Sequence, residues 1–150
     1  MTDLPATPRF AFPLLAVGQA QKEVTHNEAL MLIDVLVQAA VVAGPMTDPP
    51  VAAVTGQCWL VGAAASGAWA GQATKVALWT AGGWRFVAPR EGMRLVRTSD
   101  GAVLRFDGSA WVPPASVTAP SGGAVIDVEA RSALAALMLL LDAHGLMISA

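Results

Sequence analysis

Residues 75–89 read KVALWTAGGWRFVAP and contain the pattern of a β-hairpin, with β-forming residues on both sides of a short glycine-bearing turn. Trp79 and Trp84 flank this turn five residues apart, so we expect their rings to pack across it. The stretch FDGSAW repeats the arrangement with Phe106 and Trp111. These repeated aromatics are therefore predicted to be packing residues of two hairpins.

Short runs of β-forming residues continue on either side of these hairpins, among them QCWLVG, MRLVRT and AVLRFD. Glycine and Asp-Gly turns separate them, which predicts a compact antiparallel β meander or a small barrel. The clearest turn is at 99–101. Asp100 and Asp107 lie in Asp-Gly turns, so we expect their carboxylates to cap turn backbone rather than to act as a catalytic pair.

The N-terminal part predicts an extended arm and one helix. Prolines interrupt residues 1–18, which indicates an arm lying on another surface. A helix is predicted over 27–39, and Thr25 with Glu28 fits a capping box at its start. Its apolar face is predicted to consist of Leu30, Ile33, Leu36 and Val37.

The C-terminal part predicts a linker over 115–126 and a second helix within 127–150. Asp127 suits the start of this helix and His144-Gly145 its end. A helix that is apolar nearly all round must be covered, and another copy of the chain or another protein is the expected cover. The predicted oligomerisation stripe is Leu134, Leu137, Met138 and Leu141.

These segments together predict an α+β protein with four parts. They are the arm (1–18), a helix plus a small β domain (19–114), the linker (115–126) and the C-terminal helix (127–150).

The composition favours an oligomer. Hydrophobic residues make up 55% of the 150 residues and charged residues only 13%, against about 25% in a typical soluble domain. The apolar runs are too short for a membrane span, which needs roughly 20 residues. A net charge of -2 argues against nucleic acid as a partner. The one cysteine, Cys58, permits no internal disulfide or cysteine-built metal site and is predicted to be a buried, inert thiol.

No pattern predicts an enzyme or a cofactor. The sequence lacks a Gly-Xaa-Ser-Xaa-Gly elbow, a His-Glu-Xaa-Xaa-His motif and a phosphate-binding glycine loop. Its two histidines, His26 and His144, stand at the predicted ends of helices, where a capping role explains them.

Arginines and one tryptophan are the candidates for ligand binding. Trp69 lies between glycines in GAWAG and is expected to face outward, although it could instead cover the core. Five arginines gather in the β region, and their planar groups suit carboxylates, phosphates and acidic sugars. The alternative is a solvated strand face that pairs with acids of a neighbouring subunit. The candidate ligand-binding residues are Trp69, Arg90 and Arg94; the other arginines are Arg85, Arg97 and Arg105.

In combination, QAQKEVTHNEALMLIDVLVQA, GAWAGQ, ALWTAGGWRFVAPREG and FDGSAWVPP resemble a domain-of-unknown-function family of alphaproteobacterial prophages and gene transfer agents. Its members occur in tail-fibre and head-spike proteins. The resemblance covers about residues 14–114, and EARSALAALMLLLDAHGLM resembles the C-terminal helix of such proteins. It implies a virion component without enzyme activity, made in the bacterial cytoplasm, that helps a particle attach to its host.

The expected function is therefore a homo-oligomeric head-spike base or fibre adaptor that supports attachment to host surface polysaccharide. A spike on a capsid vertex would be a pentamer and a fibre a trimer. Its other partners would be capsid, spike or fibre proteins. The alternative is a carbohydrate-binding module that itself grips the host glycan, and a weaker one is a polysaccharide-degrading enzyme.

Overall fold

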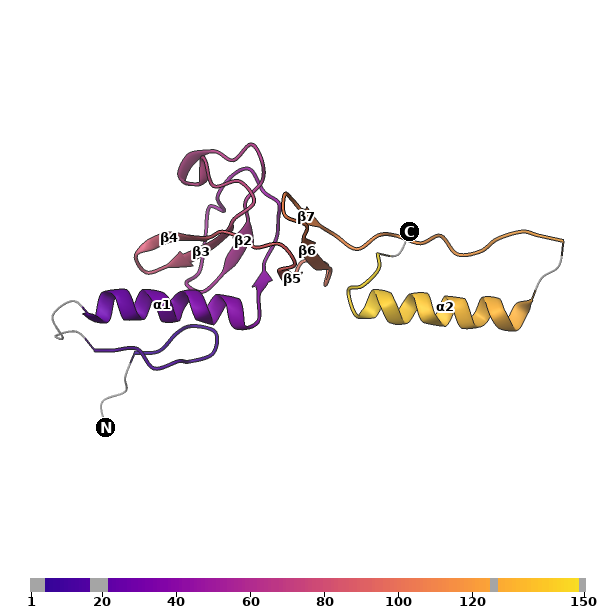
Figure 1. Cartoon of the computed structure of the whole chain (residues 1–150), viewed down its shortest axis with the longest axis horizontal. Helices are drawn as coiled ribbons and strands as arrows, with labels where there is room; N and C mark the ends of the chain where they lie inside the picture. The colour runs from indigo at the N-terminus through magenta and orange to yellow at the C-terminus, as the bar shows by residue number, and fades with distance from the viewer. Residues whose placement is uncertain (1–4, 17–21, 125–126, 149–150) are drawn as a thin grey trace.

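The computed structural model describes residues 5–16, 22–124 and 127–148 (Figure 1). These ranges contain two α-helices, α1 (Lys22–Val37) and α2 (Val128–Ala143), and one 3-10 turn, η1 (Gly67–Trp69). The strands are β1 (Ala40–Val41), β2 (Cys58–Leu60), β3 (Val76–Thr80), β4 (Gly83–Val87), β5 (Arg94–Arg97), β6 (Val103–Phe106) and β7 (Trp111–Val112).

The strands form two open sheets, ordered β1-β5-β6-β7 and β2-β3-β4. All pairs are antiparallel except β1 with β5, which is parallel. After β1 the chain runs beside β2, because Val42 N–H donates to the Cys58 carbonyl and Leu60 N–H donates to that of Ala43. The predicted α+β class is confirmed, and the described strands do not close into the barrel that was the alternative to a meander.

Both aromatic hairpins form as predicted. Trp79 lies directly opposite Trp84 in the β3–β4 pair, with ring centroids 4.9 Å apart. Phe106 lies opposite Trp111 in the β6–β7 pair, with centroids 5.4 Å apart. Cross-strand aromatic pairs stabilise antiparallel strands, so the same local pattern supports one hairpin in each sheet.

The predicted turn at 99–101 joins β5 to β6, and the two aspartates cap their turns as expected. Asp100 Oδ1 accepts from the Ala102 N–H at 3.2 Å. Asp107 Oδ1 accepts from the N–H groups of Ser109 and Ala110, each at 2.8 Å. Both carboxylates therefore serve local backbone.

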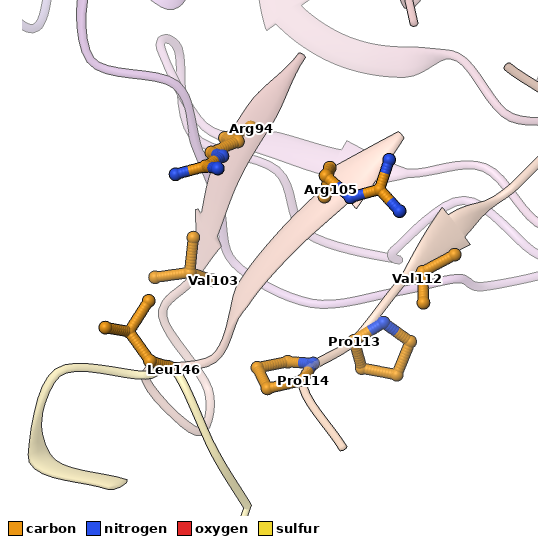
Figure 2. A pocket seen from close by; sticks show the side chains of 7 residues that line it. All are labelled: Arg94, Val103, Arg105, Val112, Pro113, Pro114 and Leu146. Carbon is orange, nitrogen blue, oxygen red and sulfur yellow. The ribbon is translucent and has the colours of Figure 1, made fainter. Parts of the chain in front are cut away.

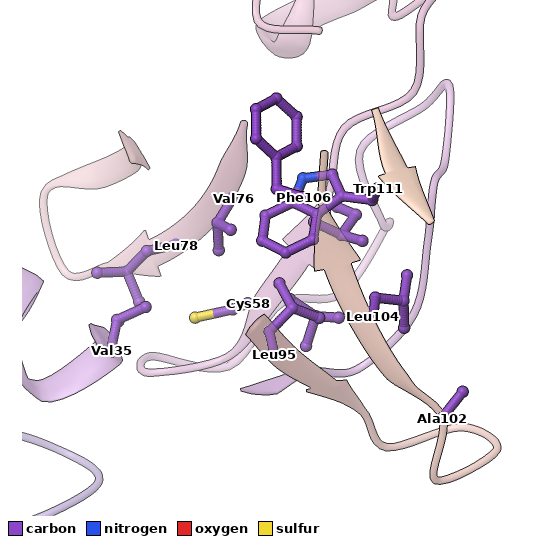
Figure 3. Close-up of a cluster of buried hydrophobic side chains, with 11 residues drawn as sticks. Val35, Cys58, Val76, Leu78, Leu95, Ala102, Leu104, Phe106 and Trp111 are labelled. Carbon is purple, nitrogen blue, oxygen red and sulfur yellow. The ribbon is translucent and has the colours of Figure 1, made fainter. Parts of the chain in front are cut away.

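The larger core cluster fills the space between the two sheets and α1 (Figure 3). Cys58 is part of it and is 2% exposed, which confirms the predicted buried thiol. Burial raises the pKa of this thiol to about 11. The cluster consists of Val35 from α1, Val41, Cys58, Leu60, Val76 and Leu78 from β1 to β3, and Leu95, Ala102, Leu104, Phe106 and Trp111 from β5 to β7 and their turns.

Helix α1 begins at Lys22, five residues before the predicted start, so the predicted capping box is wrong. Lys22 and Glu23 are good helix formers, and Glu23 also suits the positive end of the helix dipole. Thr25 and His26 consequently lie inside the helix rather than at its cap.

The end of α1 is held by the N-terminal arm, which folds back on the helix. Arg9 donates from its guanidinium to the carbonyls of Val35 at 3.2 Å and Gln38 at 2.9 Å. These bonds satisfy carbonyls at the negative end of the helix, whose own last turn contains no basic residue. The surface on which the arm lies is thus a helix of its own chain.

The face that α1 turns to the core also differs from the prediction. Val35 and Asp34 are buried, at 2% and 1% exposure, and Met31 packs beside Val35. Three residues of the predicted apolar face stay exposed, namely Ile33, Leu36 and Val37. The arm explains this, because it presents donors to the Asp34 carboxylate and so fixes the rotation of the helix.

Helix α2 lies beyond the sheets and runs back alongside the extended segment that leads to it (Figure 1). Asp127 caps its start as predicted, accepting from the Ala130 N–H at 2.8 Å, and His144 is at its C-terminal cap. The tail then docks on the β5–β6 hairpin, since Val103 N–H donates to the Gly145 carbonyl at 2.9 Å. Neither helix of the described residues has the length and apolarity needed to cross a bilayer.

Candidate functional site

Trp69 is a core residue, and the expectation that it faces outward is wrong. Its exposure is 0%, and its ring meets that of Trp84 edge to face at a centroid distance of 5.1 Å. Trp84 also contacts Trp59 at 5.6 Å and Trp79 at 4.9 Å. The glycine-flanked segment turns Trp69 inward, so that four tryptophans form one cluster around Trp84.

The fifth tryptophan connects the two sheets. Trp111 is 8% exposed and lies in the core cluster, and its Nε1–H donates to the Thr74 carbonyl at 2.7 Å. Trp111 lies in β7, at the edge of the four-stranded sheet, and Thr74 precedes β3 of the three-stranded sheet. This bond therefore links the two sheets. None of the five rings is thus an exposed platform for a sugar.

Two of the arginines have partners within the chain. Arg85 forms an ion pair with Glu28 at 2.7 Å and so connects β4 to α1. Arg97 binds Asp100 at 2.5 Å and the Gly44 carbonyl at 3.0 Å. The hydrogen bonds from Arg97 are the main cause of the lowered pKa of Asp100. These two arginines therefore have structural roles.

Arg94 and Arg105 lie directly opposite each other on β5 and β6. Both are exposed, and they alternate with the buried residues Leu95 and Leu104. They therefore share the outer face of the four-stranded sheet. Arg90, the other candidate, lies in the turn before β5 and is exposed, apart from this pair.

The arginine pair borders a hollow of about 300 Å³, which we call the arginine hollow (Figure 2). Val103 and Val112 lie on the same sheet face, since Val112 is the register partner of Arg105. The chain after β7 and the tail after α2 complete the wall. The hollow is lined by Arg94, Val103, Arg105, Val112, Pro113, Pro114 and Leu146.

The sequence prediction included Arg94 but not Arg105 among the candidate ligand residues. Counting outward from the turn at 99–101 would have placed the two residues opposite each other. Alternation along β6 would then have placed Arg105 on the solvent side, because its neighbours Leu104 and Phe106 are apolar.

The surface of α2 is the second candidate site. None of its described side chains is buried, and Leu137, Leu139 and Leu140 are 50%, 68% and 54% exposed. Two apolar hollows of about 330 and 550 Å³ separate the helix from the extended segment around Val117. All four residues of the predicted stripe line the smaller hollow, namely Leu134, Leu137, Met138 and Leu141.

The described residues contain no group of three or more His, Cys, Asp or Glu side chains placed to hold a metal ion. His26 is exposed on α1, and His144 is exposed at the end of α2.

The comparison with protein families gives one result that bears on this chain. Residues 26–112 match the model of a family described as "Protein of unknown function (DUF2793)", and the match includes α1 from residue 26 onward and all seven strands of the described structure. It ends before the extended segment and α2. No curated protein matches the chain.

Proposed function

From the premise that this chain belongs to the DUF2793 family, we propose that it is a structural subunit of a phage or gene transfer agent particle. In this proposal it assembles with copies of itself through α2, as a head-spike base or a fibre adaptor. It supports attachment of the particle to host surface polysaccharide and has no enzyme activity.

The observation that carries the assembly proposal is the exposed apolar surface of α2. The helix has no charged residue over 132–141, and leucines 134, 137, 139 and 140 are 47–68% exposed. Burying a leucine side chain completely contributes roughly 1.5–3 kcal/mol, so covering four that are already half-buried contributes several kcal/mol. An isolated chain would leave this surface in water, which is unfavourable.

A second copy is the occupant best suited to this surface. Each copy presents the same uncharged helix and the same two hollows beside it, so identical helices can bury their leucines against one another without placing any charge in the contact. The low share of charged residues in the whole chain, 13%, agrees with a subunit that has much of its surface covered. Both a five-fold ring and a three-fold bundle are compatible with helices packed around an axis.

The setting on a particle is supported by the sequence resemblance. Within residues 14–114, the motifs that resemble prophage and gene transfer agent proteins lie in α1, in the segment that contains η1, and in the β3–β4 and β6–β7 hairpins. These elements contribute residues to the two core clusters of the domain. A carbohydrate-binding module with Trp69 as its platform is not carried forward, because that ring is fully buried.

The assembly proposal is tested by the mass of the purified chain in solution. Multi-angle light scattering should give a closed oligomer for the wild type, and Leu137→Glu with Leu140→Glu should convert it to a folded monomer. The matched control is Val51→Glu with Val54→Glu, which adds the same charge at exposed positions of the β domain, 107% and 65% exposed. A wild-type monomer, or equal dissociation of both double variants, would refute the role of α2.

The setting is tested separately by mass spectrometry of phage-like particles purified from the strain that encodes the chain. We expect the chain in the particles at a few copies per spike or fibre. An oligomer that is absent from particles would keep the assembly and reject the virion role.

A further inference from the structure

Arg94 and Arg105 form a like-charge pair at directly opposed positions of an antiparallel ladder. Like charges at directly opposed positions destabilise a sheet. Figure 2 shows the two guanidinium groups turned away from each other. The fold thus holds two positive charges on neighbouring strands, and neither stabilises the other.

No carboxylate within the described residues forms an ion pair with Arg94 or Arg105. Neither guanidinium makes a hydrogen bond or an ion pair there, in contrast to Arg85 with Glu28 and Arg97 with Asp100. Asp107 is an electrostatic neighbour of Arg105, but its Oδ1 accepts from the Ser109 hydroxyl as well as from two turn N–H groups. These hydrogen bonds within the turn are the main cause of the lowered pKa of Asp107, and the charge of Arg105 makes the smallest contribution.

The remainder of the arginine hollow is apolar. Val103 lies two residues before Arg105 on β6 and Val112 lies opposite Arg105 on β7, and two prolines with Leu146 close the other side. A volume of about 300 Å³ is at the small end of ligand sites, which suits one compact group rather than an extended molecule. The hollow therefore combines two free planar cations with an apolar wall.

We propose that the arginine hollow binds an oxyanion carried by a compact ring, with the carboxylate of an acidic monosaccharide unit as the simplest case. Both side chains are exposed, and rotation of their guanidinium groups toward the hollow lets each donate N–H bonds to the oxyanion, whose negative charge offsets their repulsion. The C–H face of the sugar ring packs on the valines and prolines. A free phosphate shares the anionic part of this chemistry but lacks the ring.

This site does not depend on assembly through α2, because every residue that lines it belongs to one chain. Leu146 lies in the tail that is docked on the hairpin, so docking of the tail completes the wall. The site can therefore be present even if the chain proves to be a monomer.

The test is calorimetric titration of the full chain at low salt with glucuronate, glucose and inorganic phosphate. We expect glucuronate to bind with a dissociation constant on the order of 1 mM, glucose not to bind, and phosphate to bind several-fold more weakly than glucuronate. Arg94→Gln and Arg105→Gln should each weaken glucuronate binding at least 10-fold, as expected for loss of a charge-assisted pair. Arg105→Lys keeps the charge but loses the planar fork and should weaken it as well.

Arg90→Gln is the matched control, since it removes the same charge from an exposed position outside the hollow and should leave binding unchanged. Thermal melts establish that each variant is folded, and loss of either arginine should not lower the melting temperature. Phosphate binding as tight as glucuronate overturns the saccharide assignment. No binding of either anion overturns the site. Dissociation of the oligomer in Arg94→Gln would then make the pair a contact for acids of a second copy.

Discussion

The backbone N–H of Val103 donates a 2.9 Å hydrogen bond to the carbonyl oxygen of Gly145, which joins β6 to the turn after α2. Gly145 is buried and has a φ of +67°, in the left-handed region that favours glycine. A Cβ at this position would overlap the Gly101 carbonyl oxygen. The close approach of these two backbones places Leu146 at the arginine hollow and fixes where α2 leaves the β domain.

Gly145→Ala should undock the tail and α2 from the hairpin. The added methyl group meets rigid backbone as well as an unfavourable φ, so we expect a loss of about 1–3 kcal/mol in the free energy of unfolding. Proteolysis over 115–124 should also become faster. Gly122→Ala is the control, because Gly122 has a similar φ of +72° but nothing within 4 Å of the added Cβ. Docking that survives in Gly145→Ala would contradict the proposed overlap.

Asp34→Asn should release the N-terminal arm. The buried carboxylate accepts from the Thr7 hydroxyl at 2.7 Å and from the N–H groups of Phe10 and Arg9 at 2.8 and 3.0 Å. An amide nitrogen in its place would face a donor, which should lower the free energy of unfolding by about 1–3 kcal/mol. Urea denaturation gives this quantity, and proteolysis within residues 5–16 reports release of the arm.

The control for the Asp34 variant is Asp48→Asn. Asp48 is exposed, and its carboxylate accepts from the side chains of Thr47 and Ser66. A surface substitution of this kind should change stability by less than about 0.5 kcal/mol. If both variants lost the same stability, the buried acceptor at Asp34 would not be what holds the arm.

Trp69→Ala should destabilise the domain by about 3–5 kcal/mol, because it opens a cavity in the tryptophan cluster. Trp69→Phe should cost less, since the buried Nε1–H of Trp69 has no hydrogen-bond partner among the described residues and the change breaks no bond. Urea denaturation measures both losses, with the fully exposed Val51→Ala as control. Unchanged stability in Trp69→Ala would show that the ring is not a core residue in solution.

Stability should fall between pH 9 and pH 11 through the thiol of Cys58. Burial raises the pKa of this thiol from 9.0 to about 11. As pH rises, the Cys58 thiol therefore ionises in the unfolded chain at a lower pH than in the folded chain. The stabilising contribution is complete below pH 9 and is lost as pH passes through the folded pKa, with a total of roughly 2–3 kcal/mol. Cys58→Ala removes this titration, so the difference between the two stability curves isolates it. Parallel curves would place the thiol in contact with water.

Features that depend on neighbours in the chain were predictable. Residues on either side of a short turn meet whatever the remainder of the molecule does, so the pairs Trp79 with Trp84 and Phe106 with Trp111 followed from their spacing. The caps at Asp127, Asp100 and Asp107 are equally local, because each carboxylate binds backbone within three residues of itself.

Features that depend on distant contacts were not predictable from spacing. The rotation of α1 follows from Asp34, whose partners lie 24–27 residues earlier in the arm. Trp69 looked exposed because glycines surround it, yet Trp84 from a different strand provides the surface that buries its ring.

The amino-acid sequence alone was sufficient for the α+β class, the hairpins and the apolar character of α2, since local propensity and periodicity specify them. The folded chain was needed to show which side chains meet across long separations. In the folded chain Trp69 is buried, Leu137 and Leu140 are exposed, and Arg94, Arg105 and Leu146 line one hollow. The physical reason is that burial and neutralisation of charge depend on every segment packed around a residue, whereas a turn or a cap depends on only a few bonds nearby.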